Sequence, residues 1–288
     1  MSFRGIILMA RPMVIVAGVL AYLVGVALAH YRGYELGMGE VLLGSLVFIL
    51  ANSSGHYVDE YADRDTDALT RKTMFSGGSD VLPAGNVGPA VALIAGVLTA
   101  LLSLTVSFIL WIWFGLSDAN MVVLVIALIG GWAYSLPPIN LERRGWGEMD
   151  NALIGGLLMP LYGYTFIGGT IDLEALAMLT PLVLAVFLNL LGVHWPDRIA
   201  DGSVGKMTLV VLLGARTRWL HATMVLALLA CYALLYLGPY PPMLSILLIV
   251  VASVAVYASW EYGGELTTYL STVHMGLVMA TMIIVLWS

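Results

Sequence analysis

Long stretches of this chain contain no Asp, Glu, Lys or Arg, and they constrain the fold more than any other feature. They run over 12–29, 41–58, 81–117, 119–141, 151–171, 175–196, 219–260 and 266–288. About 20 apolar residues in an α-helix are enough to cross the hydrocarbon core of a membrane. Only 10% of the residues are charged and 60% are hydrophobic, which excludes a soluble enzyme. The net charge of −6 argues against nucleic-acid binding. The sequence therefore predicts an all-α integral membrane protein.

The stretch 219–260 is long enough for two helices. It is interrupted by Gly238-Pro239-Tyr240-Pro241-Pro242, and this run predicts a turn because proline cannot continue a helix. The stretch 81–117 opens with a Pro- and Gly-rich segment and predicts one long, tilted helix. We therefore expect a bundle of nine transmembrane helices that forms a single domain over residues 1–288.

The basic residues predict the orientation of this bundle. Of the 12 Lys and Arg residues, all except Arg32 lie at the N-terminus or in the alternate loops 59–87, 136–150 and 197–218. Such residues are retained on the cytoplasmic side of a membrane, so we expect a cytoplasmic N-terminus in a multi-pass plasma-membrane protein. These loops are also the long ones, and long loops gathered on one face usually carry function. The active site is therefore expected at the cytoplasmic end, capped by these loops.

The pattern His-x-x-Asp-x-x-x-Asp occurs twice, each time at the predicted cytoplasmic end of a helix. Its members are His56, Asp59 and Asp63 in the first copy, and His194, Asp197 and Asp201 in the second. At 100° per residue, the three residues of each copy share one helix face, and Asn52 lies on the same face as the first copy.

Two facing pairs of aspartates require cations, because carboxylates one helical turn apart repel each other at a membrane boundary. Hard carboxylate oxygens favour Mg²⁺, which usually binds one or two carboxylates together with substrate phosphates. The sequence thus predicts that the four aspartates of the two motifs hold Mg²⁺ ions that bridge a diphosphate. Glu60 and Asp65, which lie outside the repeated pattern, are interpreted as solvated.

Each acidic motif is followed by a loop rich in Gly and basic residues. The first loop carries Arg71, Lys72 and Ser76 before Gly77-Gly78, and the second carries Gly205-Lys206. Small residues allow backbone N–H groups to approach phosphate oxygens, and the cations add charge-assisted hydrogen bonds. These residues are predicted to bind the diphosphate, although Arg71 and Lys72 also fit a simple excess of positive charge at the cytoplasmic face.

Together these motifs resemble the UbiA superfamily of intramembrane prenyltransferases, and the resemblance covers nearly the whole chain. Asp59 and Asp63 match the later aspartates of the family's first motif. The second motif and its extension match as Asp197-x-x-x-Asp201-x-x-x-Gly205-Lys206-x-Thr-Leu.

Three further features belong to this resemblance. Arg11-Pro12 resembles the family's opening, and Tyr134-Ser-Leu-Pro-Pro followed by Arg144-Gly-Trp-Gly147-Glu148 resembles its fourth-loop signature. The sequence departs from the family pattern at His56, where an aspartate is usual, and at His194, where an Asn is common.

The resemblance implies Mg²⁺-dependent transfer of a prenyl group from a polyprenyl diphosphate to a small aromatic or lipid acceptor in the membrane. It implies catalytic roles for the four aspartates and for Tyr134, which with Trp146 would face the allylic cation. Imidazole is a poor Mg²⁺ ligand, so both histidines are predicted to contact the diphosphate or to support the ligands. The residues predicted to bind the diphosphate are Asn52, His56, Arg71, Lys72, Ser76, Arg144, His194 and Lys206.

The acceptor is encoded less strongly than the reaction. The Phe75-Ser-Gly-Gly-Ser79 loop and the Gly-Lys-x-Thr-Leu extension look closest to 1,4-dihydroxy-2-naphthoate polyprenyltransferases. Acceptors such as 4-hydroxybenzoate, homogentisate or geranylgeranylglyceryl phosphate stay open, as does cyclisation of the prenyl chain. Different classes are a secondary transporter, whose sites usually lie near the membrane midplane, and a non-catalytic lipid-binding scaffold.

Overall fold

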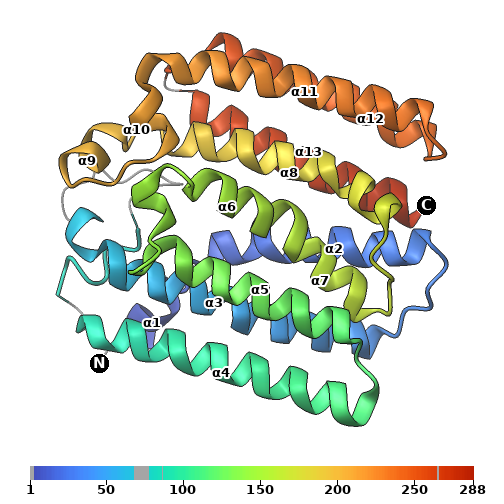
Figure 1. Cartoon of the computed structure of the whole chain (residues 1–288), viewed down its shortest axis with the longest axis horizontal. Coiled ribbons are helices and arrows are strands. Elements are labelled where there is room, and N and C mark those ends of the chain that lie inside the picture. Colours follow the sequence, from blue (N-terminus) through green and yellow to red (C-terminus); the bar gives the residue numbers. More distant parts are fainter. Residues whose placement is uncertain (1–2, 68–77, 86, 265) are drawn as a thin grey trace.

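The computed structural model describes residues 3–67, 78–85, 87–264 and 266–288, and every regular element in these ranges is helical. The long helices lie roughly side by side along the longest axis of the molecule, and the two termini lie at opposite ends (Figure 1). The short helices α1 (Phe3–Met9), α9 (Arg198–Ser203) and α10 (Leu209–Leu213) gather at one end, which we call the loop end. The prediction of an all-α bundle is confirmed.

Eight helical segments in the described chain are long and apolar enough to cross a membrane. They correspond to α2 (Pro12–Tyr31), α3 (Met38–Asp67), α4 (Pro89–Phe114), α5 (Asp118–Ser135), α8 (Leu173–Val193), α11 (Thr217–Leu237), α12 (Pro242–Trp260) and α13 (Thr267–Trp287). As predicted, α4 begins only after the Pro- and Gly-rich lead-in, and α11 ends where the run Gly238–Pro242 begins.

The remaining predicted stretch, 151–171, does not form one α-helix. It is helical from Gly147 to Phe166 but is divided into α6 (Gly147–Leu153), a π-helical turn η2 (Ile154–Leu158) and α7 (Met159–Phe166). The N–H of Met159 bonds to the carbonyl of Ile154, five residues back, and Pro160 has no N–H to continue the helical ladder. This segment is therefore not among the eight spans, and the count of nine is not reached on this criterion.

Small residues allow the broken helix to pack closely against its neighbour α2. A Cβ placed on Gly25 would lie 1.7 Å from the carbonyl oxygen of Pro160, and one placed on Gly163 would lie 2.2 Å from that of Tyr22. Close backbone approach through small residues is a common way for helices to associate within a membrane. This contact fixes α2 beside α7, and both helices form walls of the cavity described next.

Candidate active site

The acidic face of α3 opens onto a cavity of about 740 Å³ at the loop end of the bundle. The helix continues without a break to Asp67, so Asn52, His56, Asp59 and Asp63 line the same cavity, as predicted. The deeper walls come from α2, α3, α5, η2, α7, α8 and α13 and are mainly apolar. They include Leu20, Phe48, Leu124, Leu128, Leu158, Met275 and Met279. The cavity thus joins a charged end to a long apolar chamber.

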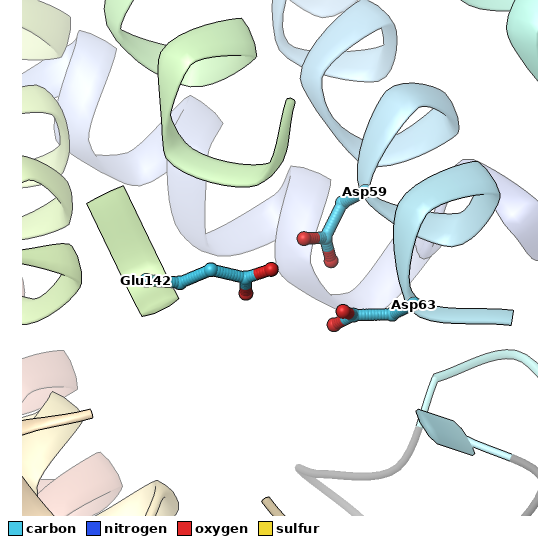
Figure 2. Close-up of side chains that lie close together, drawn as sticks. All are labelled: Asp59, Asp63 and Glu142. Atoms are coloured by element: carbon cyan, nitrogen blue, oxygen red, sulfur yellow. The ribbon is translucent and has the colours of Figure 1, made fainter. Parts of the chain in front are cut away.

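Three carboxylates meet at the charged end. Asp59 and Asp63 come from α3, and Glu142 comes from the short helix η1 (Leu141–Arg144) (Figure 2). One oxygen atom from each of the three lies within 4.8 Å of the others. Figure 2 shows the Glu142 side chain pointing across the gap toward α3. Such a donor set suits one hard divalent cation.

Two basic side chains contact this cluster from distant parts of the sequence. Lys206 Nζ lies 2.6 Å from Asp63 Oδ2 and 2.7 Å from Glu142 Oε2. Arg11 Nη1 lies 2.9 Å from Asp59 Oδ2, and the Ser135 hydroxyl donates to Asp59 Oδ1 at 2.6 Å. The second oxygen of Asp63, Oδ1, is buried and has no hydrogen-bond partner among the described residues.

The charges of the cluster are not balanced. Burial raises the pKa of Glu142 to about 8, and the charges of Asp63 and Asp59 add to this rise while Lys206 opposes it. Burial alone would lower the pKa of Lys206, but the surrounding carboxylates raise it well above its ordinary value. The ammonium is therefore held in its charged form, and the raised pKa of Glu142 reflects its burial beside two other carboxylates.

The second motif lines the same cavity. Asp197 and Asp201 both line it, together with Lys206. Asp197 directly precedes α9, and the Lys206 N–H donates to the Asp201 carbonyl at 2.9 Å, which closes a tight loop. Burial raises the pKa of Asp201 to about 6. The two motifs therefore converge, although Asp197 and Asp201 lie outside the group of carboxylates close enough to share one ion.

His194 is held by a buried carboxylate. Its Nδ1 lies 3.1 Å from Oε1 of Glu148, a residue of α6 with no exposed surface, and the same oxygen accepts the Leu209 N–H at 2.9 Å. Burial would lower the pKa of His194, but the hydrogen bond and charge of Glu148 raise it above the ordinary value. His194 lines the cavity.

Some predicted residues lie elsewhere. Tyr134 is buried and lines the cavity, whereas Trp146 is 61% exposed and does not. Arg144 is exposed, and its Nη2 donates to the Pro138 carbonyl at 2.7 Å rather than reaching the cavity. The predicted diphosphate ligands Arg71, Lys72 and Ser76 lie outside the described residues.

The structure corrects one interpretation and adds residues that the sequence did not single out. Asp65 is exposed as predicted, but Glu60 is only 1% exposed and is not solvated. It accepts from Arg11 Nε at 2.8 Å and from the backbone N–H of Ser79 at 2.8 Å, and it also accepts the Ser79 hydroxyl. The burial of Glu60 could have been predicted only from its basic partner. That partner, Arg11, lies 49 positions away in the sequence, so the sequence contains no indication of the pair. Glu142 lies in a loop without helical periodicity, so its approach to α3 had no signal in the sequence.

Comparisons with known proteins identify the family and several relatives. The model of the UbiA prenyltransferase family matches residues 18–268. A protoheme IX farnesyltransferase from Anaeromyxobacter dehalogenans is 26% identical over 206 residues, which cover 71% of this chain and 66% of the relative. The bacteriochlorophyll synthase 33 kDa chain of Rhodobacter capsulatus is 26% identical over 205 residues, which cover 69% of this chain and 60% of the relative. These alignments span somewhat less than two thirds of the relatives' length.

Solved structures share the fold over nearly the whole chain. A UbiA homologue from Archaeoglobus fulgidus, in complex with GPP and Mg²⁺, superposes with a TM-score of 0.74 at 17% identity and covers 99% of this chain and 100% of that one. A digeranylgeranylglyceryl phosphate synthase superposes with a TM-score of 0.72 at 15% identity, covering 99% and 98%. None of these four proteins is named for dihydroxynaphthoate, so that part of the resemblance stays a prediction. With a family model matched from residue 18 to residue 268, the chain belongs to the UbiA prenyltransferase family.

Proposed function

We propose that this protein transfers a prenyl group from a prenyl diphosphate to an acceptor within the membrane. The observation that carries this proposal is the meeting of both acidic motifs at one end of a cavity whose remaining walls are mainly apolar. A diphosphate needs cations and polar donors, whereas its isoprenoid tail needs a chamber without water. In this cavity the charged end adjoins the apolar part. Its volume of about 740 Å³ lies in the range of ligand-binding pockets.

The residues present fit a magnesium ion. Asp59, Asp63 and Glu142 offer hard oxygen ligands within 4.8 Å of one another, and Asp63 Oδ1 is a buried acceptor without a partner in the described chain. We propose that these three carboxylates hold one ion and that Asp197 and Asp201 hold a second against the same diphosphate. Bound Mg²⁺ neutralises the diphosphate and makes it a better leaving group.

The protein's own groups would complete the site. Lys206 and Arg11 lie beside the carboxylates and can donate charge-assisted hydrogen bonds to the diphosphate. Tyr134 is buried at the cavity wall, where its ring can face the allylic cation. The apolar walls exclude water, which would otherwise capture that cation. His56 lies one turn deeper than Asp59 and lines the same space, as does Asn52.

We further propose an aromatic quinone precursor as the acceptor, on the strength of the loop sequences. We also propose a topology in which Gly147–Phe166 forms a ninth span and the N-terminus is cytoplasmic. The loop end, with the active site, then lies on the cytoplasmic side of the plasma membrane. All basic residues except Arg32 belong to the N-terminal segment or to the loops 59–87, 136–150 and 197–218, and this supports the orientation.

The test is an assay of purified protein in detergent with farnesyl or geranylgeranyl diphosphate, in Mg²⁺ or in EDTA. The acceptor panel contains 1,4-dihydroxy-2-naphthoate, 4-hydroxybenzoate, homogentisate, geranylgeranylglyceryl phosphate and protoheme IX. Mg²⁺-dependent prenylation of one acceptor is the expected result. Mg²⁺-dependent pyrophosphate release without acceptor would indicate cyclisation instead. Folded protein that consumes no donor would overturn the proposal in favour of transport or lipid binding.

A further inference from the structure

His194 lines the cavity, and its ring is paired with the buried carboxylate of Glu148. The roles of metal ligand and diphosphate donor proposed above do not use this pair. Glu148 is fully buried at the start of α6, and its Oε1 lies 3.1 Å from His194 Nδ1. The Leu209 N–H, at the start of α10, donates to the same oxygen at 2.9 Å. Glu148 therefore fixes the ring of His194 against two neighbouring elements.

This arrangement determines where the ring carries its proton. An ionised carboxylate only accepts hydrogen bonds, so the Nδ1 atom of His194 must donate to Glu148. In the neutral ring, Nε2 is then left with a lone pair. Within the described chain, every hydrogen bond of this ring is made through Nδ1. A buried carboxylate also stabilises the imidazolium that forms when Nε2 takes up a proton.

The position of His194 places its ring beside the predicted site of the reaction. His194 lines the cavity between the apolar residues of α8, such as Leu190, and Asp197 of the second motif. The diphosphate is expected at the aspartates and the prenyl tail among the apolar walls, so His194 lies at the boundary between them. An acceptor must reach this boundary to attack the first carbon of the prenyl chain.

We infer that His194, oriented by Glu148, is the base that removes the proton the acceptor loses on prenylation. This inference rests on the function proposed above. In the step, the bond between the first prenyl carbon and the diphosphate oxygen breaks, and its electron pair leaves with the diphosphate. A bond forms between that carbon and the acceptor atom. The proton of that atom, from a C–H or an O–H, passes to Nε2 of His194. Glu148 is a positioning residue that acts through the ring.

His56 holds the matching place in the first motif but lacks this arrangement. Its Nε2 is buried and has no hydrogen-bond partner among the described residues, and no carboxylate is bonded to the ring there. The paired motifs therefore differ in chemistry despite their identical spacing. The difference lies in Glu148, which approaches only the second histidine.

The test uses full-length protein with geranylgeranyl diphosphate and an acceptor that wild type prenylates at a C–H or O–H position, with 4-hydroxybenzoate tried first. Two variants remove the base: His194→Ala, and His194→Gln, which can still donate to Glu148. We expect both to lower kcat by about 100-fold or more while the donor Kd stays within about threefold of wild type. Imidazole should restore part of the rate of His194→Ala. Glu148→Gln should lower kcat by about tenfold or more.

The matched control is His30→Ala, because His30 is exposed near the far end of α2. It should keep the wild-type rate. A donor Kd that rises in parallel with the loss of rate in His194→Gln would make His194 a diphosphate ligand and overturn the inference. A wild-type rate in His194→Gln would do the same, since the side chain would then be structural. Failure of the proposed function can be distinguished from failure of this inference, because the wild-type protein itself would then consume no donor.

Discussion

Lys206→Met should destabilise the protein strongly, because it leaves two buried carboxylates without their cation. The lysine side chain is 11% exposed, and its partners Asp63 and Glu142 are 7% and 1% exposed. Removing one partner of a buried ion pair costs about 3–5 kcal/mol. Glu142 takes up a proton readily, since burial raises its pKa to about 8, and this limits the penalty. We therefore expect a loss of about 3 kcal/mol, or a fall in Tm of roughly 6–12 °C.

The assay is thermal unfolding in detergent, in EDTA and in Mg²⁺. Methionine keeps most of the apolar stem of Lys206, so lost packing contributes little to the change. A divalent cation can replace the missing ammonium, and a ligand at about 100 times its Kd stabilises the bound state by about 2.7 kcal/mol. Mg²⁺ should therefore raise the Tm of Lys206→Met more than that of wild type. Kinetically, the variant should raise the donor KM.

Two controls separate the ion pair from a general effect of charge. Arg216→Met removes an exposed cation near the loop end and should leave Tm nearly unchanged. Adding Glu142→Gln to Lys206→Met removes the unpaired acid, so the double variant should recover part of the loss. If Lys206→Met has the same Tm as wild type in EDTA, the reasoning is refuted. A double variant less stable than either single one would refute it as well.

Three further outcomes are expected. Asp201→Asn should lower prenyl transfer by about 100-fold or more and leave Tm close to wild type, because burial already favours the neutral form of this side chain; retained activity would contradict its role at the metal site. Because the Asp201 pKa is raised to about 6, protons should compete with Mg²⁺ below that pH, and the Mg²⁺ concentration for half-maximal activity should rise between pH 7.5 and 5.5. In a Cys231→Ser background, Ser203→Cys should react with impermeant thiol reagents only from the cytoplasmic side and Asp118→Cys only from outside; the reverse pattern would invert the topology.

Much of the fold could be predicted from hydropathy because a membrane imposes a length and a composition on every helix that crosses it. Charge-free stretches predicted the eight spans, and proline placed the turn between α11 and α12. The division of the segment Gly147–Phe166 was missed. It arises from a register change next to Pro160, where one missing N–H is accommodated by a π-helical turn. Hydropathy averages over this detail.

The helix face predicted for His194, Asp197 and Asp201 is wrong, because α8 ends at Val193 and α9 begins only at Arg198. The acidic residues of the first motif could be predicted because they lie on one continuous helix, where periodicity decides which side chains share a face. Asp59 and Asp63 therefore face the cavity as expected. Their partners could not be predicted in the same way, since Glu142 and Arg11 reach them from segments whose positions depend on tertiary packing. Arg144 was predicted to bind the diphosphate but bonds to the Pro138 carbonyl instead. A local sequence signature gives no information on the direction in which a loop side chain points.

The placement of these partners follows from the energetics of charge at a membrane boundary. Carboxylates on α3 cannot move toward water without unwinding the helix, so the fold brings cations to them. Arg11 precedes α2 and Lys206 follows α9, and both lie in connections that can adjust their path. The Arg11 backbone adopts a left-handed conformation, with φ 51°, that is uncommon for a residue other than glycine. Such conformations persist only where the surrounding contacts hold them. The bonds from Arg11 to Asp59 and Glu60 provide those contacts, so the acids on α3 determine the path by which the chain enters α2.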